Sequence, residues 1–142
     1  RDGGAVAKAL IEQVRATEAE LLGSRSADLQ AVGKRLADGS RALEAAVDFV
    51  VSNMKSDVRA VFAGSVPYLK LAGIVLSGWQ LARGALAADR LLGDGNADAA
   101  FLKAKIGTSR FHADHLLNQA PALASSILEG AAGVLALEVD QF

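Results

Sequence analysis

The chain has 142 residues, of which 15 are basic and 16 acidic, and it contains no cysteine. This length fits a single domain with its own hydrophobic core, expected over residues 1–142. The balanced charge shows no basic stripe, which argues against nucleic-acid binding, and the lack of cysteine excludes disulfides and thiolate metal ligands. Alanine and leucine supply roughly a third of the residues and proline only two, which predicts an all-α fold.

The first helix is expected over residues 5–22. The second is expected to begin after a cap at Ser26 and to end at about residue 53. An apolar stripe marks the first: Val6, Leu10, Val14 and Leu21. Glu18 is expected outside that stripe. The second has apolar residues at intervals of three and four: Leu29, Val32, Leu36, Leu43, Val47, Val50 and Met54. Gly39 or Ser40 fills the missing step, where a small residue lets a neighbouring helix approach closely.

A third long helix is expected over residues 66–92, after a short extra turn at 57–63 and a start marked by Ser65 and Pro67. Its residues 71–82 carry no charge, but a membrane span needs about twenty apolar residues. The charges that follow, from Arg83 onward, come too soon for a span. We therefore expect a core helix that is covered on all sides, with no membrane contact, and a close helix–helix contact at Gly78.

The C-terminal third is expected to hold two more helices. A turn at 93–96 leads to a cap at Asn96 and a helix over residues 97–117. Its apolar face comprises Phe101, Leu102, Ile106, Ala113 and Leu117. Pro121 then separates a last, shorter helix over residues 122–137, with an apolar face of Leu123, Ile127, Ala131, Val134 and Leu137. The prediction is an up-down four-helix bundle with a short additional C-terminal helix.

Both histidines of the chain lie in one short run, which makes that run the best candidate for a metal site. His112 and His115 fall on neighbouring turns of one helix, with Asp114 between them. No Glu-x-x-His pair of the di-iron type accompanies them. The alternative, which we favour, is that His112 faces solvent and His115 packs its ring while hydrogen-bonding a neighbour. The run at 93–98 resembles a calcium loop but lacks its length and its terminal glutamate. No metal ligand is therefore assigned.

Two further groups of residues are candidates for binding. Five cations would form a phosphate-binding patch if the third and fourth helices are neighbours: Arg83, Arg90, Lys103, Lys105 and Arg110. Tyr68 and Trp79 would line a ligand cavity. Solvated outer charges and core aromatics are the favoured alternatives. The sequence lacks a Gly-rich phosphate loop, a G-x-S-x-G elbow and an inward-facing carboxylate pair. No catalytic or cofactor-binding residue is therefore assigned.

Three stretches carry a family resemblance: "VGKRLADGSRALEAAVDFV", "VPYLKLAGIVLSGWQLARGALAA" and "FLKAKIGTSRFHADHLLNQAPAL". Together they resemble the C-terminal domain of acyl-CoA dehydrogenases of the long bacterial type, the 3-methylmercaptopropionyl-CoA dehydrogenase-like enzymes. The most specific positions are Pro67, Tyr68, Leu69, Gly78 and Trp79, with the run at 105–111. His112 departs from the family, which prefers an aromatic residue there.

The resemblance implies a parent enzyme that is FAD-dependent and dehydrogenates an acyl-CoA at its α and β carbons. The flavin site and the catalytic carboxylate would belong to preceding domains, so none of their residues is carried over. The bundle is expected to support those domains and a homo-oligomeric interface in a cytoplasmic enzyme, without a cofactor of its own. A start at "RDGG" rather than at methionine fits an excised fragment. The alternative is a stand-alone helical protein-interaction module.

Overall fold

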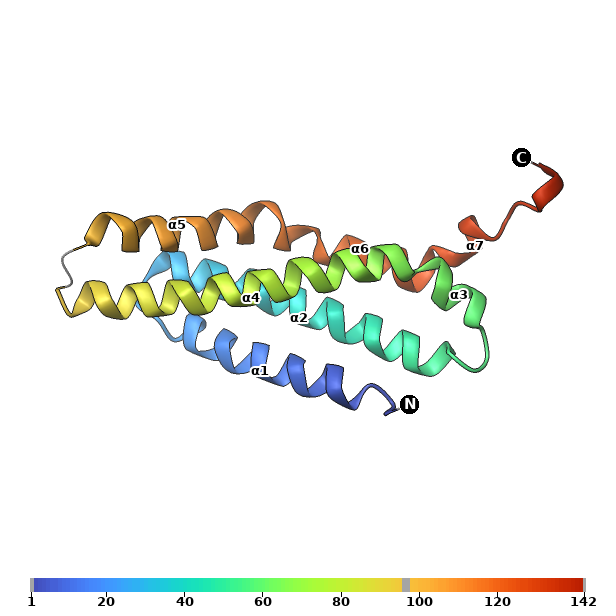
Figure 1. The fold of residues 1–142 in the computed structure, drawn as a ribbon, viewed down its shortest axis with the longest axis horizontal. Helices are drawn as coiled ribbons and strands as arrows, with labels where there is room; N and C mark the ends of the chain where they lie inside the picture. The colour runs from blue at the N-terminus through green and yellow to red at the C-terminus, as the bar shows by residue number, and fades with distance from the viewer. Residues whose placement is uncertain (1, 96–97, 142) are drawn as a thin grey trace.

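The computed structural model describes residues 2–95 and 98–141, and the regular structure in these ranges is helical. Five helices build the bundle: α1 (Ala5–Leu22), α2 (Ala27–Asn53), α4 (Ser65–Gly93), α5 (Ala99–His115) and α6 (Ala120–Glu129). The first three lie side by side, and α5 and α6 follow one another along the fourth position (Figure 1). The expected all-α bundle with an additional C-terminal helix is confirmed.

Side-chain caps set where several helices begin. The Ser26 hydroxyl accepts a hydrogen bond from the Leu29 amide at 3.4 Å, which confirms the cap expected for α2. A short helix, α3 (Val58–Ala63), begins at Asp57, whose carboxylate accepts from the Ala60 amide at 3.1 Å. The cap expected at Asn96 lies outside the described residues. Asp98 caps α5 instead, so this helix begins at Ala99.

The break between α5 and α6 precedes Pro121 by several residues. A 3₁₀ turn, η1 (Leu117–Gln119), separates the two helices, and Pro121 lies inside the first turn of α6. A proline has no amide hydrogen, and its ring clashes with the carbonyl four residues earlier. The Leu117 carbonyl accepts from the Ala120 amide instead, as in a 3₁₀ turn. The helix expected to run to residue 117 ends at His115.

Leu117, the first residue of this turn, lies at the centre of the bundle. Its side chain is fully buried and lies against Gly39 of α2 and Gly78 of α4. A Cβ at Gly39 would lie 3.1 Å from Leu117 Cδ2, and one at Gly78 would lie 2.9 Å from Leu117 Cδ1. The two glycines thus make room for one leucine, because a close-packed interior has no spare volume. The close contacts expected at Gly39 and Gly78 are confirmed.

The single last helix expected over residues 122–137 is wrong. The α6 helix ends at Glu129, and a Cβ at the capping residue Gly130 would lie 2.4 Å from the Ser126 carbonyl oxygen. Two short pieces follow, α7 (Ala131–Val134) and the 3₁₀ turn η2 (Val139–Gln141). Val134 and Leu137 were expected in the core, but they are 64% and 53% exposed because the chain leaves the bundle here (Figure 1).

The helix faces also differ from expectation at particular positions. In α1 the buried stripe runs through Ile11, Val14, Thr17, Glu18 and Leu21. Its spacing of three and four extends back to Ala7, so Val6 is 75% exposed rather than in the stripe. Glu18, expected outside, is buried. Phe101 of α5, expected inside, is 55% exposed.

One side of α4 has no cover in the described part of the chain. Leu71, Val75 and Ala82 are buried against the bundle, but Val66 and Leu69 are 76% and 75% exposed. The expectation of cover on all sides is therefore wrong. This helix is long and apolar enough to cross a membrane by length and composition, and 44% of its most apolar stretch is buried in the bundle. The absence of membrane contact stays a prediction.

Candidate functional site

The two histidines take the opposite roles to those expected. His112 is buried between α5 and α4, with its Nε2 3.0 Å from the Ser77 hydroxyl oxygen. That hydroxyl donates to the Gly73 carbonyl at 2.7 Å, so its oxygen accepts from the Nε2–H of a neutral His112 ring. His115 is exposed, and its ring lies against Phe111 with ring centroids 4.5 Å apart.

The electrostatics at His112 oppose charging of the ring. Burial lowers the pKa of His112 below its ordinary value near 6.5, because a buried cation loses its hydration. Its Nδ1 is buried without a hydrogen-bond partner among the described residues, as is the Ser109 hydroxyl three residues earlier. Asp114 instead accepts from Arg110 Nε at 2.6 Å. The described residues contain no group of three or more possible metal ligands.

The five candidate cations do not converge on one site. Arg90 pairs with Glu20 of α1 at 2.6 Å, and Arg110 pairs with Asp28 of α2 at 3.0 Å. Two others lie over aromatic rings of their own helices: the Arg83 guanidinium over Trp79 at 5.4 Å, and the Lys105 ammonium over Phe101 at 5.3 Å. Lys103 is exposed on α5. Arg83 and Arg90 both line one hollow beside Glu20, but the other three cations are not among its lining residues.

Trp79 belongs to the core, as the favoured interpretation held. It is 8% exposed, and its indole Nε1–H donates to the Thr17 hydroxyl at 2.8 Å. This bond joins α4 to α1 across the bundle. Sequence analysis missed Thr17 as its partner. The signal was present, because Thr17 falls three residues after Val14 and four before Leu21, within the buried stripe.

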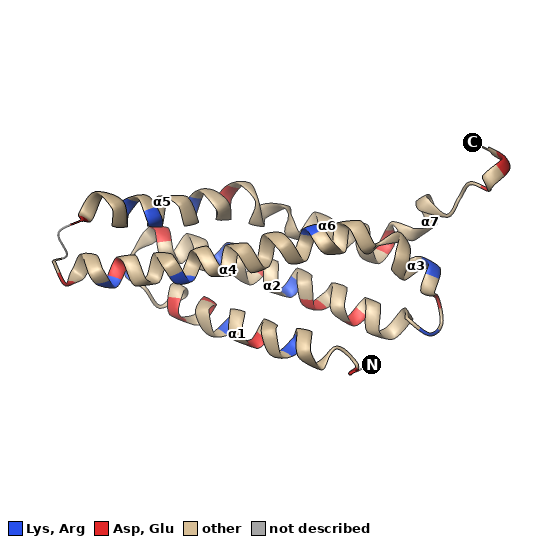
Figure 2. Cartoon of the chain, viewed as in Figure 1, with Lys and Arg blue, Asp and Glu red and all other residues tan. Residues whose placement is uncertain are grey.

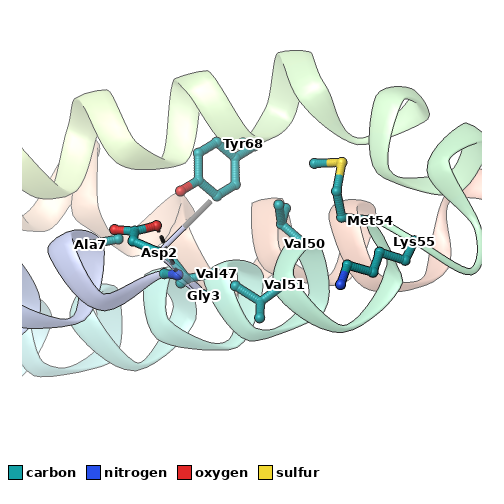
Figure 3. A pocket seen from close by; sticks show the side chains of 10 residues that line it. Asp2, Gly3, Ala7, Val47, Val50, Val51, Met54, Lys55 and Tyr68 are labelled. Carbon is teal, nitrogen blue, oxygen red and sulfur yellow. Dashed lines mark hydrogen bonds between the residues drawn. The ribbon is translucent and has the colours of Figure 1, made fainter.

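Tyr68 lines an open groove of about 560 Å³ between the start of α1, the end of α2 and the start of α4. Figure 3 shows its ring above Asp2 and Val47, with Val50, Val51, Met54 and Lys55 toward the other end of the groove. The other lining residues are Gly3, Gly4 and Ala7.

The chemistry of this groove is that of an apolar contact surface. Asp2 accepts from the Val6 and Gly4 amides at 3.1 and 3.2 Å, and these bonds hold its pKa below the usual value. Burial raises the pKa of Tyr68, so its hydroxyl stays protonated at neutral pH. None of the lining residues forms a nucleophile–base pair. The groove can therefore hold apolar groups but offers no means to activate them.

Comparison with known proteins identifies relatives over nearly the whole chain. Residues 10–138 match the family model described as "Acetyl-CoA dehydrogenase C-terminal like". The chain is also 40% identical over 129 residues to 3-methylmercaptopropionyl-CoA dehydrogenase of Ruegeria pomeroyi. That alignment covers 91% of this chain but 22% of the relative. The chain thus spans about a fifth of the curated relative that it matches.

Proposed function

Because this chain belongs to the family of acetyl-CoA dehydrogenase C-terminal-like domains, we propose that it is the C-terminal bundle of a larger acyl-CoA dehydrogenase-like flavoenzyme. In this role it supports the catalytic domains and the subunit interface. The observation that carries the proposal is the family match over residues 10–138, together with a relative that is much longer than this chain.

The parent would contain FAD, and we propose that its other domains hold this cofactor. Proteins hold a pyrophosphate with the free amides of helix N-termini or with cationic side chains. In the described residues, side chains already occupy the starts of several helices: Asp2, Ser26, Asp57 and Asp98. The groove beside Tyr68 is lined by one cation, Lys55, and largely by apolar groups. We therefore assign no part of the flavin chemistry to this chain.

The fold supports a structural role through its rigid core and its uncovered apolar surface. Buried side chains of all five long helices form one cluster, so we expect the bundle to hold its shape without another domain. Large apolar side chains remain exposed on α3, α4 and α5, including Phe62, Leu69 and Phe111. Exposed apolar side chains of this size mark surfaces that contact other protein when they gather into a patch.

The test compares the complete reading frame with a version that lacks the bundle. We expect the complete protein to contain FAD and to reduce an electron acceptor when an acyl-CoA is added. Removal of residues 1–142 should lower the melting temperature of the flavin-containing part and shift its sedimentation to smaller species. The flavin spectrum of the remaining part should persist, because the cofactor site lies outside this chain.

Two outcomes would contradict the proposal. A complete protein without flavin and without acyl-CoA oxidation would contradict the activity proposed for the parent enzyme. If deletion of the bundle leaves the melting temperature and sedimentation of the remaining part unchanged, the supporting role is contradicted. That result would favour the alternative of a protein-interaction module with an unrelated partner.

A further inference from the structure

A polar hollow of about 480 Å³ lies between α1 and α4, away from the groove beside Tyr68. Most of its lining side chains are polar or charged, and they come from these two helices: Thr17, Glu20, Gln80, Arg83 and Arg90. Its volume is in the range of pockets that hold small molecules. The groove beside Tyr68 suits apolar groups, whereas this cavity, here called the α1–α4 hollow, suits a polar or charged ligand.

The Arg83 guanidinium lines this hollow and has no carboxylate partner in the described part of the chain. Two contacts position it: its Nη1 donates to Gln80 Oε1 at 3.0 Å, and the group lies over the Trp79 ring at 5.4 Å. A guanidinium has five N–H donors, so most of those on Arg83 remain for a ligand. Gly84, the next lining residue, leaves the approach open, because a Cβ there would meet nothing within 4 Å.

Arg90 brings a second cation to the same hollow. It follows Arg83 by seven residues, which is about two turns along one face of α4. Its Nη2 donates to Glu20 Oε2 at 2.6 Å, and that bond leaves its other N–H donors unused. Basic positions lie along the half of α4 that leads to α5, and acidic positions lie at the end of α1 nearest to it (Figure 2). Three other acidic residues of these helix segments do not line the hollow: Glu18, Asp89 and Asp94. Two cations therefore face one carboxylate.

We propose that the α1–α4 hollow binds a terminal phosphate group. Arg83 contacts the phosphate oxygens with its free N–H donors, and Arg90 shares its guanidinium between the phosphate and Glu20. The planar guanidinium suits this ligand because it offers two parallel N–H donors to a pair of phosphate oxygens. A terminal phosphate carries a charge of about −1.5 to −2 at pH 7. It therefore gains more from two cations than a phosphodiester, which carries a smaller charge on each phosphorus.

This inference is independent of the role proposed for the parent enzyme, because both helices that form the hollow belong to this chain. Two sources supply a terminal phosphate: free inorganic phosphate and the monophosphate of a nucleotide such as AMP. FAD serves as the comparison ligand, since its two phosphorus atoms lie within a diester and it has no terminal phosphate.

The experiment follows the arginine Nε–H resonances of the 142-residue chain by NMR as each ligand is added at constant ionic strength. We expect the resonances of Arg83 and Arg90 to shift and to saturate with inorganic phosphate or with AMP, and to stay in place with FAD. The ligand that saturates the shift at the lower concentration identifies the source. Binding should weaken as salt is added, because the contact is electrostatic and exposed.

Substitutions separate this site from general attraction to basic residues. Arg83→Gln should weaken phosphate binding by about tenfold or more, since it removes the unpaired cation. Glu20→Gln should tighten binding, because it frees the Arg90 guanidinium and removes the carboxylate that repels the phosphate. Lys103→Gln is the matched control, since Lys103 is an exposed cation on α5 that does not line the hollow. It should leave binding unchanged.

Circular dichroism of each variant checks that the bundle remains folded, which we expect because Glu20, Arg83 and Lys103 are all exposed. The absence of a saturable shift with both phosphate and AMP would overturn the proposal. So would binding that survives Arg83→Gln, binding that Glu20→Gln fails to tighten, or an equal loss of binding in Lys103→Gln.

Discussion

At the scale of single residues, the glycines of α4 differ in what surrounds them. A Cβ at Gly78 would meet Leu117 Cδ1 at 2.9 Å and His112 Cε1 at 3.1 Å, and both neighbours are buried. A Cβ at Gly84 would meet nothing within 4 Å. A change from glycine to alanine should therefore affect stability in opposite directions at these two positions. Helix propensity decides the outcome at Gly84, and packing decides it at Gly78.

Gly84→Ala should raise the free energy of unfolding by up to about 1 kcal/mol, the difference in helix propensity between the two residues. Gly78→Ala should lower it despite the same propensity gain, and Gly78→Leu should lower it by roughly 1–3 kcal/mol or more through overpacking. Urea unfolding followed by circular dichroism measures all three. Equal stability of Gly78→Leu and wild type would refute the close contact.

His112 makes stability depend on pH in the range where histidine titrates. Burial lowers its pKa in the folded state, whereas the unfolded chain has the ordinary value near 6.5. Between the two values the unfolded state binds more protons, so acid favours unfolding. The contribution is complete above about pH 6.5 and is lost as the pH falls toward the folded pKa. Melting temperatures between about pH 7.5 and pH 5 should therefore fall more steeply in wild type than in His112→Gln.

His115→Gln serves as the control for this measurement, because His115 lies exposed on the same helix. It should keep the wild-type pH dependence. If His112→Gln follows wild type over the whole range, the buried ring contributes nothing to the pH response.

At the scale of elements, α1 is joined to α4 by the hydrogen bond between Trp79 and Thr17. Thr17→Val keeps the shape of the side chain but leaves the buried indole N–H without its acceptor. The free energy of unfolding should fall by about 1–3 kcal/mol, the cost of an unsatisfied buried group. Thr17→Ser keeps the hydroxyl, so its free energy of unfolding should fall by a smaller amount. Guanidinium unfolding distinguishes the two, and a valine variant as stable as wild type would show that the bond contributes little.

The helix boundaries could be predicted where the deciding signal is local. The limits of α1 and the Ser26 cap follow from nearby residues, whereas α5 ends at His115, several residues before Pro121. Which face is buried depends on neighbouring helices that the sequence does not specify. The exposure of Phe101 and the burial of Glu18 were missed for that reason. The roles of His112 and His115 were reversed in the same way, since only the packing of α5 on α4 brings Ser77 within reach.

At the scale of the whole molecule, the bundle is expected to fold without a cofactor. The purified 142-residue chain should be soluble, colourless and strongly helical by circular dichroism, and added FAD should leave its melting temperature unchanged. The test is sensitive, because a ligand at 100 times its dissociation constant stabilises the folded state by about 2.7 kcal/mol. A yellow preparation, or a melting temperature that rises with FAD, would mean that the bundle forms a complete flavin site.

The burial of Trp79 also gives the molecule its own optical probe. It is the one tryptophan of the sequence, it is 8% exposed, and the Arg83 guanidinium lies over its ring. Its fluorescence emission should lie at shorter wavelength than that of a hydrated indole, and acrylamide should quench it slowly. Because the ring contacts Thr17, separation of α1 from α4 should move the emission to the red even while the other helices remain intact. A shift in emission that precedes the loss of helical signal would therefore report the release of α1 alone.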